Sequence, residues 1–100
     1  MIDLGQWLDQ QTSRAPAALR ERVQEYARSA SGSSLVASLA AAGHRALERV
    51  LSHSGDRSAA LDLLAADALI TLALLAQAES APDQLEEFAI SVLRTARPDA

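Results

Sequence analysis

Apolar residues recur at helical spacing along most of the chain, and short polar breaks separate the periodic stretches. Leucine and alanine supply most of the apolar positions, and both are strong helix formers. No window alternates apolar and polar residues as a half-buried strand would. The pattern therefore predicts an all-α fold, a compact bundle of four main helices preceded by a short N-terminal helix. The short helix is expected over about 3–11, and the main helices over about 16–30, 34–53, 57–79 and 81–97.

The breaks carry residues that typically end one helix and begin the next. Gly32 is suited to the left-handed conformation that closes a helix, and Ser33 or Ser34 can cap the helix that follows. Gly55 and Asp56 repeat the arrangement at the next break. The turn between the two longest predicted helices is therefore short, and we expect these helices to pack as antiparallel neighbours.

The segment from Arg57 to Glu79 differs from the others because it is apolar on every side. Such a helix is buried all round, either in a protein core or in a membrane. Its leucines and isoleucine favour membrane insertion by about 4 kcal/mol, but Asp67 near the centre opposes it by about 3 kcal/mol. The other predicted helices are amphipathic and need a surface to pack on. We therefore expect a largely buried central helix and no stable membrane insertion, with membrane association through 57–79 as a minor alternative.

The carboxylate of Asp67 is the anomaly of this apolar segment. Reflecting the chain about the Gly55 turn places Asp67 opposite His44, and a buried carboxylate without a partner is costly. We therefore expect His44 or Arg45 to contact Asp67, with Thr71 completing a buried polar cluster. The structural interpretation is a satisfied pair that aligns two alanine-rich helices, and we favour it. The functional interpretation is a His–carboxylate dyad, for which no nucleophile is convincingly placed.

Trp7 is the predicted docking anchor of the short N-terminal helix. Leu4, Trp7 and Leu8 fall on one face of that helix, which is too short to be stable alone. We therefore expect the helix to be held against the bundle through Trp7.

Composition narrows the function classes. The chain has 100 residues, a formal net charge of −4 and no cysteine, so disulfide and thiol chemistry are excluded. Residues 1–50 carry six arginines and five carboxylates, whereas residues 51–100 carry three arginines and eight carboxylates. This balance lacks the basic footprint of a nucleic-acid binder, so no nucleic-acid partner is expected. The halves either complement each other within one fold or present an acidic surface to a basic partner. No targeting segment is visible, and a cytoplasmic location is expected.

No sequence motif for catalysis, metal binding or a cofactor stands out. The serines around Gly32 lack the preceding strand and the Gly-Lys-Ser/Thr ending of a phosphate loop. His44 and Glu48 have helical spacing, but the pattern does not repeat as bundle metal sites require. A helix-turn-helix with Gly43 in its turn is less consistent with the surrounding alanines than one continuous helix. We therefore expect no enzyme, no metal and no cofactor.

These observations predict a single helical domain over residues 1–100. The expected function is that of a non-enzymatic protein–protein interaction or scaffolding module, whose partner is another protein or a second copy of the chain. A homo-oligomer is expected because the helix over 57–79 is apolar around more of its circumference than its short neighbours can easily cover. The alternative is a bundle that binds a small apolar ligand beside the polar cluster around Asp67.

Overall fold

The computed structural model describes residues 4–30, 32–53 and 55–96, and nearly all of them are helical. The elements in chain order are α1 (Leu4–Gln11), α2 (Ala17–Ser29), α3 (Leu35–Ser52), α4 (Arg57–Ser80), the 3-10 turn η1 (Pro82–Gln84) and α5 (Leu85–Ala96). The all-α prediction is confirmed, and each predicted main helix is present. The last helix differs in its start, because Pro82 opens a 3-10 turn before α5 begins at Leu85.

The ends of the long helices follow from their capping residues. The hydroxyl of Ser34 accepts a hydrogen bond from the amide of Ala37 at 3.1 Å, which starts α3. The carboxylate of Asp56 accepts one from the amide of Ala59 at 2.7 Å, which starts α4. Gly55 has a φ of 100°, in the left-handed region that favours glycine. The predicted caps are therefore confirmed at both of these positions.

The prediction that Gly32 closes a helix in the left-handed conformation is wrong. Among the described residues, the glycine with positive φ is Gly55. A Cβ at Gly32 would lie 2.7 Å from the amide nitrogen of Ser38. The residue is small because the chain passes closely over the first turn of α3, and its backbone conformation does not demand glycine.

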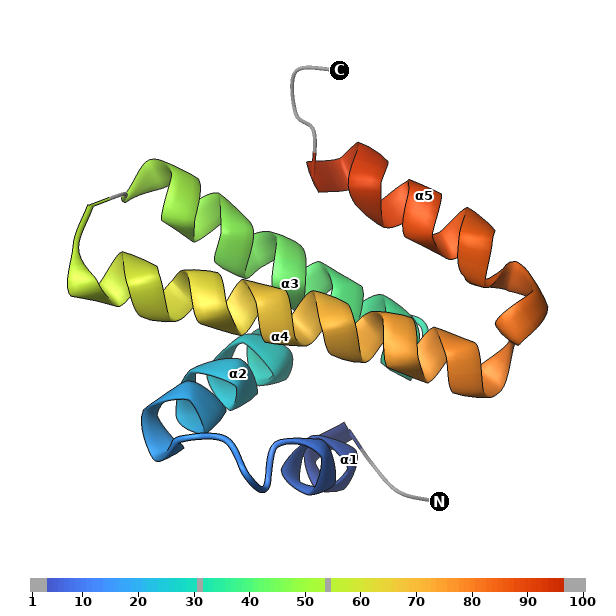
Figure 1. Ribbon diagram of the computed structural model, residues 1–100, viewed down its shortest axis with the longest axis horizontal. Coiled ribbons are helices and arrows are strands. Elements are labelled where there is room, and N and C mark those ends of the chain that lie inside the picture. The colour runs from blue at the N-terminus through green and yellow to red at the C-terminus, as the bar shows by residue number, and fades with distance from the viewer. Residues whose placement is uncertain (1–3, 31, 54, 97–100) are drawn as a thin grey trace.

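The two longest helices, α3 and α4, form an antiparallel hairpin at the centre of the molecule (Figure 1). Their backbones approach closely at Gly43, where an added Cβ would lie 2.7 Å from Cγ1 of Ile70 and 3.4 Å from Cβ of Leu69. Reflecting the chain about the Gly55 turn pairs Gly43 with Ala68. The observed register between α3 and α4 is therefore displaced from the predicted one by one to two residues. The antiparallel arrangement itself is as predicted.

Small residues, rather than leucines, make most of the buried side of α4. The buried residues of this helix are Ala59, Asp62, Ala65, Ala66, Leu69, Ala73 and Ala76. Close approach of α2 and α3 to α4 requires short side chains at the contact, which is why alanines fill it. The prediction of a largely buried central helix is therefore wrong in extent: only 39% of its most apolar 18-residue window is buried.

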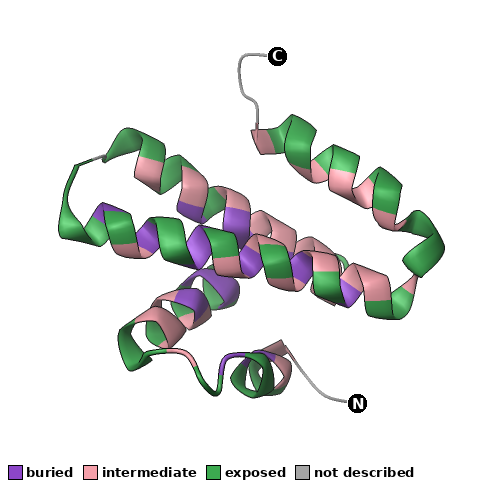
Figure 2. Cartoon of the chain, in the orientation of Figure 1, coloured by how far each residue is buried: buried purple, intermediate pink, exposed green. Residues whose placement is uncertain are grey.

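The remaining helices cover the hairpin unevenly. Buried residues gather where α2 and α3 meet α4, whereas α5 contains no buried residue (Figure 2). In Figure 1, α5 leaves the end of α4 and turns back toward α3, which it contacts over only part of its length. Phe88 packs against the core from α5, and Leu8 on α1 is fully buried. One side of the hairpin is therefore well covered and the other is not.

Candidate functional site

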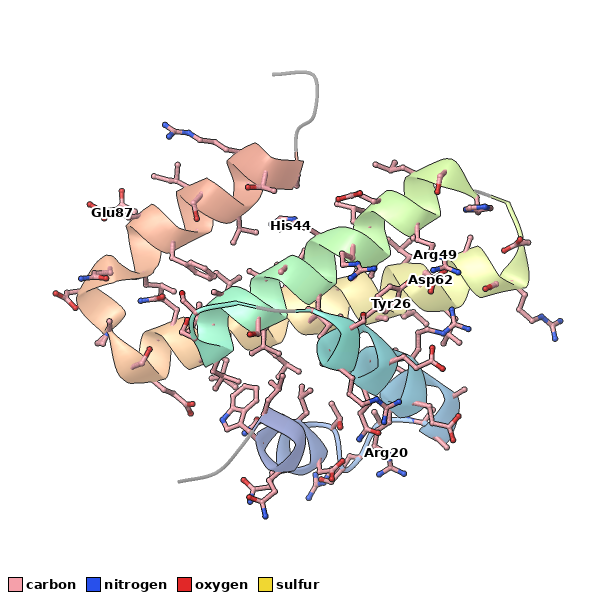
Figure 3. The ribbon with its side chains drawn as sticks, turned by 180° about the vertical axis from the view of Figure 1, so that it is seen from behind. Arg20, Tyr26, His44, Arg49, Asp62 and Glu87 are labelled. Atoms are coloured by element: carbon pink, nitrogen blue, oxygen red, sulfur yellow. The ribbon has the colours of Figure 1, made fainter. Side chains whose placement is uncertain are left out.

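The one buried carboxylate among the described residues is that of Asp62, which is 3% exposed on the side of α4 facing α2. The guanidinium of Arg22 donates a hydrogen bond to Oδ1 of Asp62 at 2.5 Å, and the hydroxyl of Tyr26 donates one to the same oxygen at 2.9 Å. Arg22 and Tyr26 are four residues apart, so α2 presents both from one face. Figure 3 shows Tyr26 and Asp62 side by side at this interface.

The surroundings set the ionisation of the two donors. Burial raises the pKa of Tyr26, and the hydrogen bond to Asp62 raises it further. The hydrogen bond to Asp62 also raises the pKa of Arg22. A tyrosine with a raised pKa remains a protonated donor at neutral pH and is a poor general base. The geometry therefore fits a structural ion pair that joins α2 to α4, and it does not fit a proton-transfer site.

A polar cleft opens directly above this ion pair, between α2 and α3. Its volume is about 730 Å³, within the range of ligand sites. We use the name polar cleft for the following nine lining residues: Arg22, Glu25, Tyr26, Ser29, Arg45, Glu48, Arg49, Ser52 and Ser58. Three arginines and three serines dominate the lining, and Ser58 brings the first turn of α4 to its edge.

The polar cluster predicted around Asp67 is not present. Asp67, Thr71 and Arg45 are exposed, and His44 is half-buried. Asp67 lies five residues from Asp62, about 140° round the helix, so burying one carboxylate leaves the other in solvent. Arg45 instead donates a hydrogen bond to the carbonyl oxygen of Ser29 at 3.2 Å, at the end of α2. Neither Asp67 nor Thr71 lines either of the two clefts described here.

His44 lies on α3 near the space between α3 and α5 (Figure 3). Burial lowers the pKa of His44, and the neighbouring charge of Glu48 opposes the shift. The imidazole is therefore favoured in its neutral form at pH 7. Among the described residues, no cluster of three or more histidine or acidic side chains could hold a metal ion.

Leu8 and Trp7 both pack the N-terminal helix against the rest of the bundle. Leu8 is fully buried, whereas Trp7 packs against the core as a half-buried residue. A second cleft of about 490 Å³ lies beside α1, and its lining includes Leu4, Leu8 and Ala27. This cleft is a seam between α1 and α2 with mixed polar and apolar walls.

Large apolar residues are exposed on three of the helices. We use the name apolar face for the following six residues on α3, α4 and α5, which are 38–65% exposed: Leu51, Leu63, Leu64, Leu75, Ile90 and Leu93. On α4 the exposed stripe also contains Asp67 and Thr71, and Thr71 lies about 180° round the helix from Asp62. On α4 itself, the exposed stripe therefore lies on the opposite side of the helix from the ion pair of Asp62.

By length and composition alone, α4 is also apolar enough to cross a membrane. One such helix is weak evidence, because the core helix of a soluble bundle has the same properties. Asp62, near the middle of its first half, is committed to the ion pair with Arg22.

Comparison with known proteins adds no family. No family model, curated protein or solved structure matches the chain significantly. The functional proposals below therefore rest on the physical properties of the exposed surface.

Sequence reasoning missed Asp62, Arg22 and Tyr26 because it expected leucines to mark the buried side of α4. The positions of the alanines could have indicated which side of α4 is buried. Most alanines of α4 lie on the same side of the helix as Asp62, and α3 carries its own run of small residues at 40–43. Two small-residue faces indicate close helix packing, and that packing buries Asp62.

Proposed function

We propose that this chain is a non-enzymatic helical interaction module that pairs with a second copy of itself through the apolar face. The observation that carries the proposal is the exposure of six leucine and isoleucine side chains on α3, α4 and α5. Exposed large apolar side chains in this number on a small domain typically mark a contact site.

The accessible area supports a partner of about the size of this chain. The chain exposes 6521 Å². A folded monomer of 10.6 kDa is expected to expose about 5,500 Å². The chain therefore exposes about 1,000 Å² more than this expectation. A standard interface buries about 800 Å² per partner. A second copy thus has sufficient surface to bury.

The arrangement of the apolar face suits a twofold contact. Leu64 and Leu75 lie on one stripe along α4, eleven residues or about three turns apart. An extended stripe of this kind can pack against the same stripe of a second copy, so that each helix covers the other. In such a dimer α5, which buries none of its residues in the monomer, gains a surface to pack on.

The mass of the protein in solution, measured by light scattering after size exclusion over a wide concentration range, tests the proposal. The wild type is expected to be a dimer. Leu64→Glu removes two leucines from a twofold interface, at about 1.5 kcal/mol each, and is expected to weaken the dimer about 100-fold. Ala18→Glu adds the same charge at an exposed position on α2 and is the matched control, expected to leave the mass unchanged.

Two outcomes would overturn the proposal. One is a strict monomer at every concentration, with Leu64→Glu indistinguishable from the wild type. The other is a monomer that binds neutral lipid vesicles and loses that binding in Leu64→Glu, which would assign the apolar face to a membrane instead of a second copy.

A further inference from the structure

The exposed side of α4 has the residue spacing of a helix that packs lengthwise against another helix. Its residues follow one another at alternating steps of four and three, which is the heptad repeat of coiled coils. We use the name outer seam for the six residues at this spacing: Ala60, Leu64, Asp67, Thr71, Leu74 and Ala78. The first four are exposed and the last two are half-buried. All six lie within about 80° of one another round the helix, opposite its buried residues. Figure 2 shows exposed residues along the whole length of α4, and no other helix crosses in front of it.

Two polar residues, Asp67 and Thr71, interrupt the middle of the outer seam. Both are exposed, and within the part of the chain that the structure describes neither side chain has a hydrogen-bond or ion-pair partner. A purely apolar partner surface would leave the carboxylate of Asp67 without a hydrogen bond, which is costly. The surface that covers the seam must therefore present a donor to Asp67 and an acceptor to Thr71.

The outer seam itself supplies this donor and this acceptor when a second copy runs antiparallel to the first. A twofold axis at the level of Leu69 places Asp67 of each copy opposite Thr71 of the other. The hydroxyl of Thr71 can then donate a hydrogen bond to the carboxylate of Asp67, and symmetry repeats the pair. The other layers of the seam bring together side chains of equal size: Leu64 with Leu74, and Ala60 with Ala78.

Other alignments of two seams satisfy the polar residues less well. A parallel pair brings the two Asp67 carboxylates together, and like charges in an interface are costly. An antiparallel pair shifted by one heptad places Asp67 against Leu64 or Ala78, neither of which has a side-chain donor. A shift by two heptads brings Arg57 opposite Asp67 but leaves the last third of the seam outside the contact. The alignment centred on Leu69 therefore pairs both polar residues and uses the whole seam.

We propose that a second copy packs its α4 antiparallel along the outer seam, and that the two Asp67–Thr71 pairs across the twofold axis set this register. The inference rests on the proposed self-association and names the surface of the partner and the residues that select it. An apolar helix without a donor opposite Asp67 is a poorer partner than a second copy, because it leaves a buried carboxylate unpaired.

Disulfide cross-linking tests the register, because the chain has no cysteine of its own. A variant that carries both Ala60→Cys and Ala78→Cys is expected to form a covalent dimer on mild oxidation, since the two positions face each other across the interface. Within one copy these positions are about 27 Å apart, which is too far for an intramolecular disulfide. Each single variant is a matched control and is expected not to cross-link, since its cysteine lies about 27 Å along the helix from its counterpart.

Substitutions at Thr71 test the polar pair. Thr71→Val keeps the shape of the side chain and removes the hydroxyl donor, so the dissociation constant of the dimer is expected to rise at least about tenfold. Thr71→Ser keeps the donor and is expected to change the dissociation constant less than about threefold. Thr71 is exposed in the monomer, so matching far-ultraviolet circular dichroism is expected for both variants.

The outcomes separate this inference from the proposed function. A dimer in which the double-cysteine variant does not cross-link, or in which a single variant cross-links as readily, overturns the register and leaves the self-association intact. A Thr71→Val variant that dimerises as tightly as Thr71→Ser overturns the polar pair. A wild type that is monomeric at every concentration overturns the self-association and the register together.

Discussion

Replacing Asp62 with alanine removes the acceptor that Arg22 and Tyr26 share between α2 and α4. The hydroxyl of Tyr26 would remain in a nearly buried position without its partner, which costs about 2 kcal/mol. The side chain of Arg22 is 25% exposed and can turn toward water and Glu25. Losing its ion pair with Asp62 therefore adds only about 1 kcal/mol to the cost. The expected destabilisation is thus about 3 kcal/mol, the low end for removing one partner of a buried pair.

Urea unfolding followed by circular dichroism at 222 nm measures this change. In a domain of this size, about 3 kcal/mol corresponds to a fall of about 15 °C in the melting temperature. Asp67→Ala is the matched control, since it deletes the same side chain from the exposed side of the same helix. It is expected to destabilise the protein by less than about 0.5 kcal/mol. Equal destabilisation by the two substitutions would refute the assignment of the buried ion pair to Asp62.

Three further predictions concern the hairpin. Gly43→Ala should destabilise the protein by about 1–2 kcal/mol despite its better helix propensity, because its Cβ meets Ile70. In a double-mutant cycle, Ile70→Ala should reduce that cost, and additive costs would contradict the close approach. Asp56→Ala should cost about 1 kcal/mol through loss of the α4 cap, and an unchanged urea midpoint would count against it. Burial lowers the pKa of His44, so the unfolded chain is protonated first as the pH falls. Stability from this residue is therefore complete above the unfolded pKa of about 6.5 and is lost as the pH falls below it. Urea midpoints between pH 7.5 and 5.5 should depend less on pH in His44→Gln than in the wild type; equal slopes would argue against this role.

The helices and their antiparallel hairpin could be predicted from sequence because they depend on local signals. Asp56, Ser34 and Gly55 act within one or two turns of their own positions, so their roles are visible in the sequence alone. The sparse burial of α5 had no such signal. The apolar residues of α5 have a regular amphipathic spacing, but this spacing does not show how closely the helix packs against its neighbours.

The rotation of α4 could not be predicted from its periodicity, and the candidate site depended on it. Leucines occur on both the buried and the exposed sides of this helix, so the apolar pattern has no preferred direction. The choice between Asp62 and Asp67 as the buried carboxylate is set by where α2 and α3 approach closely. That approach depends on alanines and Gly43, whose small size matters only once the partner helix is known.

The central claim is that the outer side of α4 faces a second copy of the chain. Because the chain has no cysteine, Thr71→Cys provides a unique site for a spin label on the exposed stripe of α4, and Ala18→Cys provides one on α2. Dipolar electron paramagnetic resonance on each labelled protein measures the distance between labels on different copies. We expect a defined intermolecular distance at Thr71 that is shorter than the one at Ala18. Absence of intermolecular coupling at both positions, or a shorter distance at Ala18, would contradict the account.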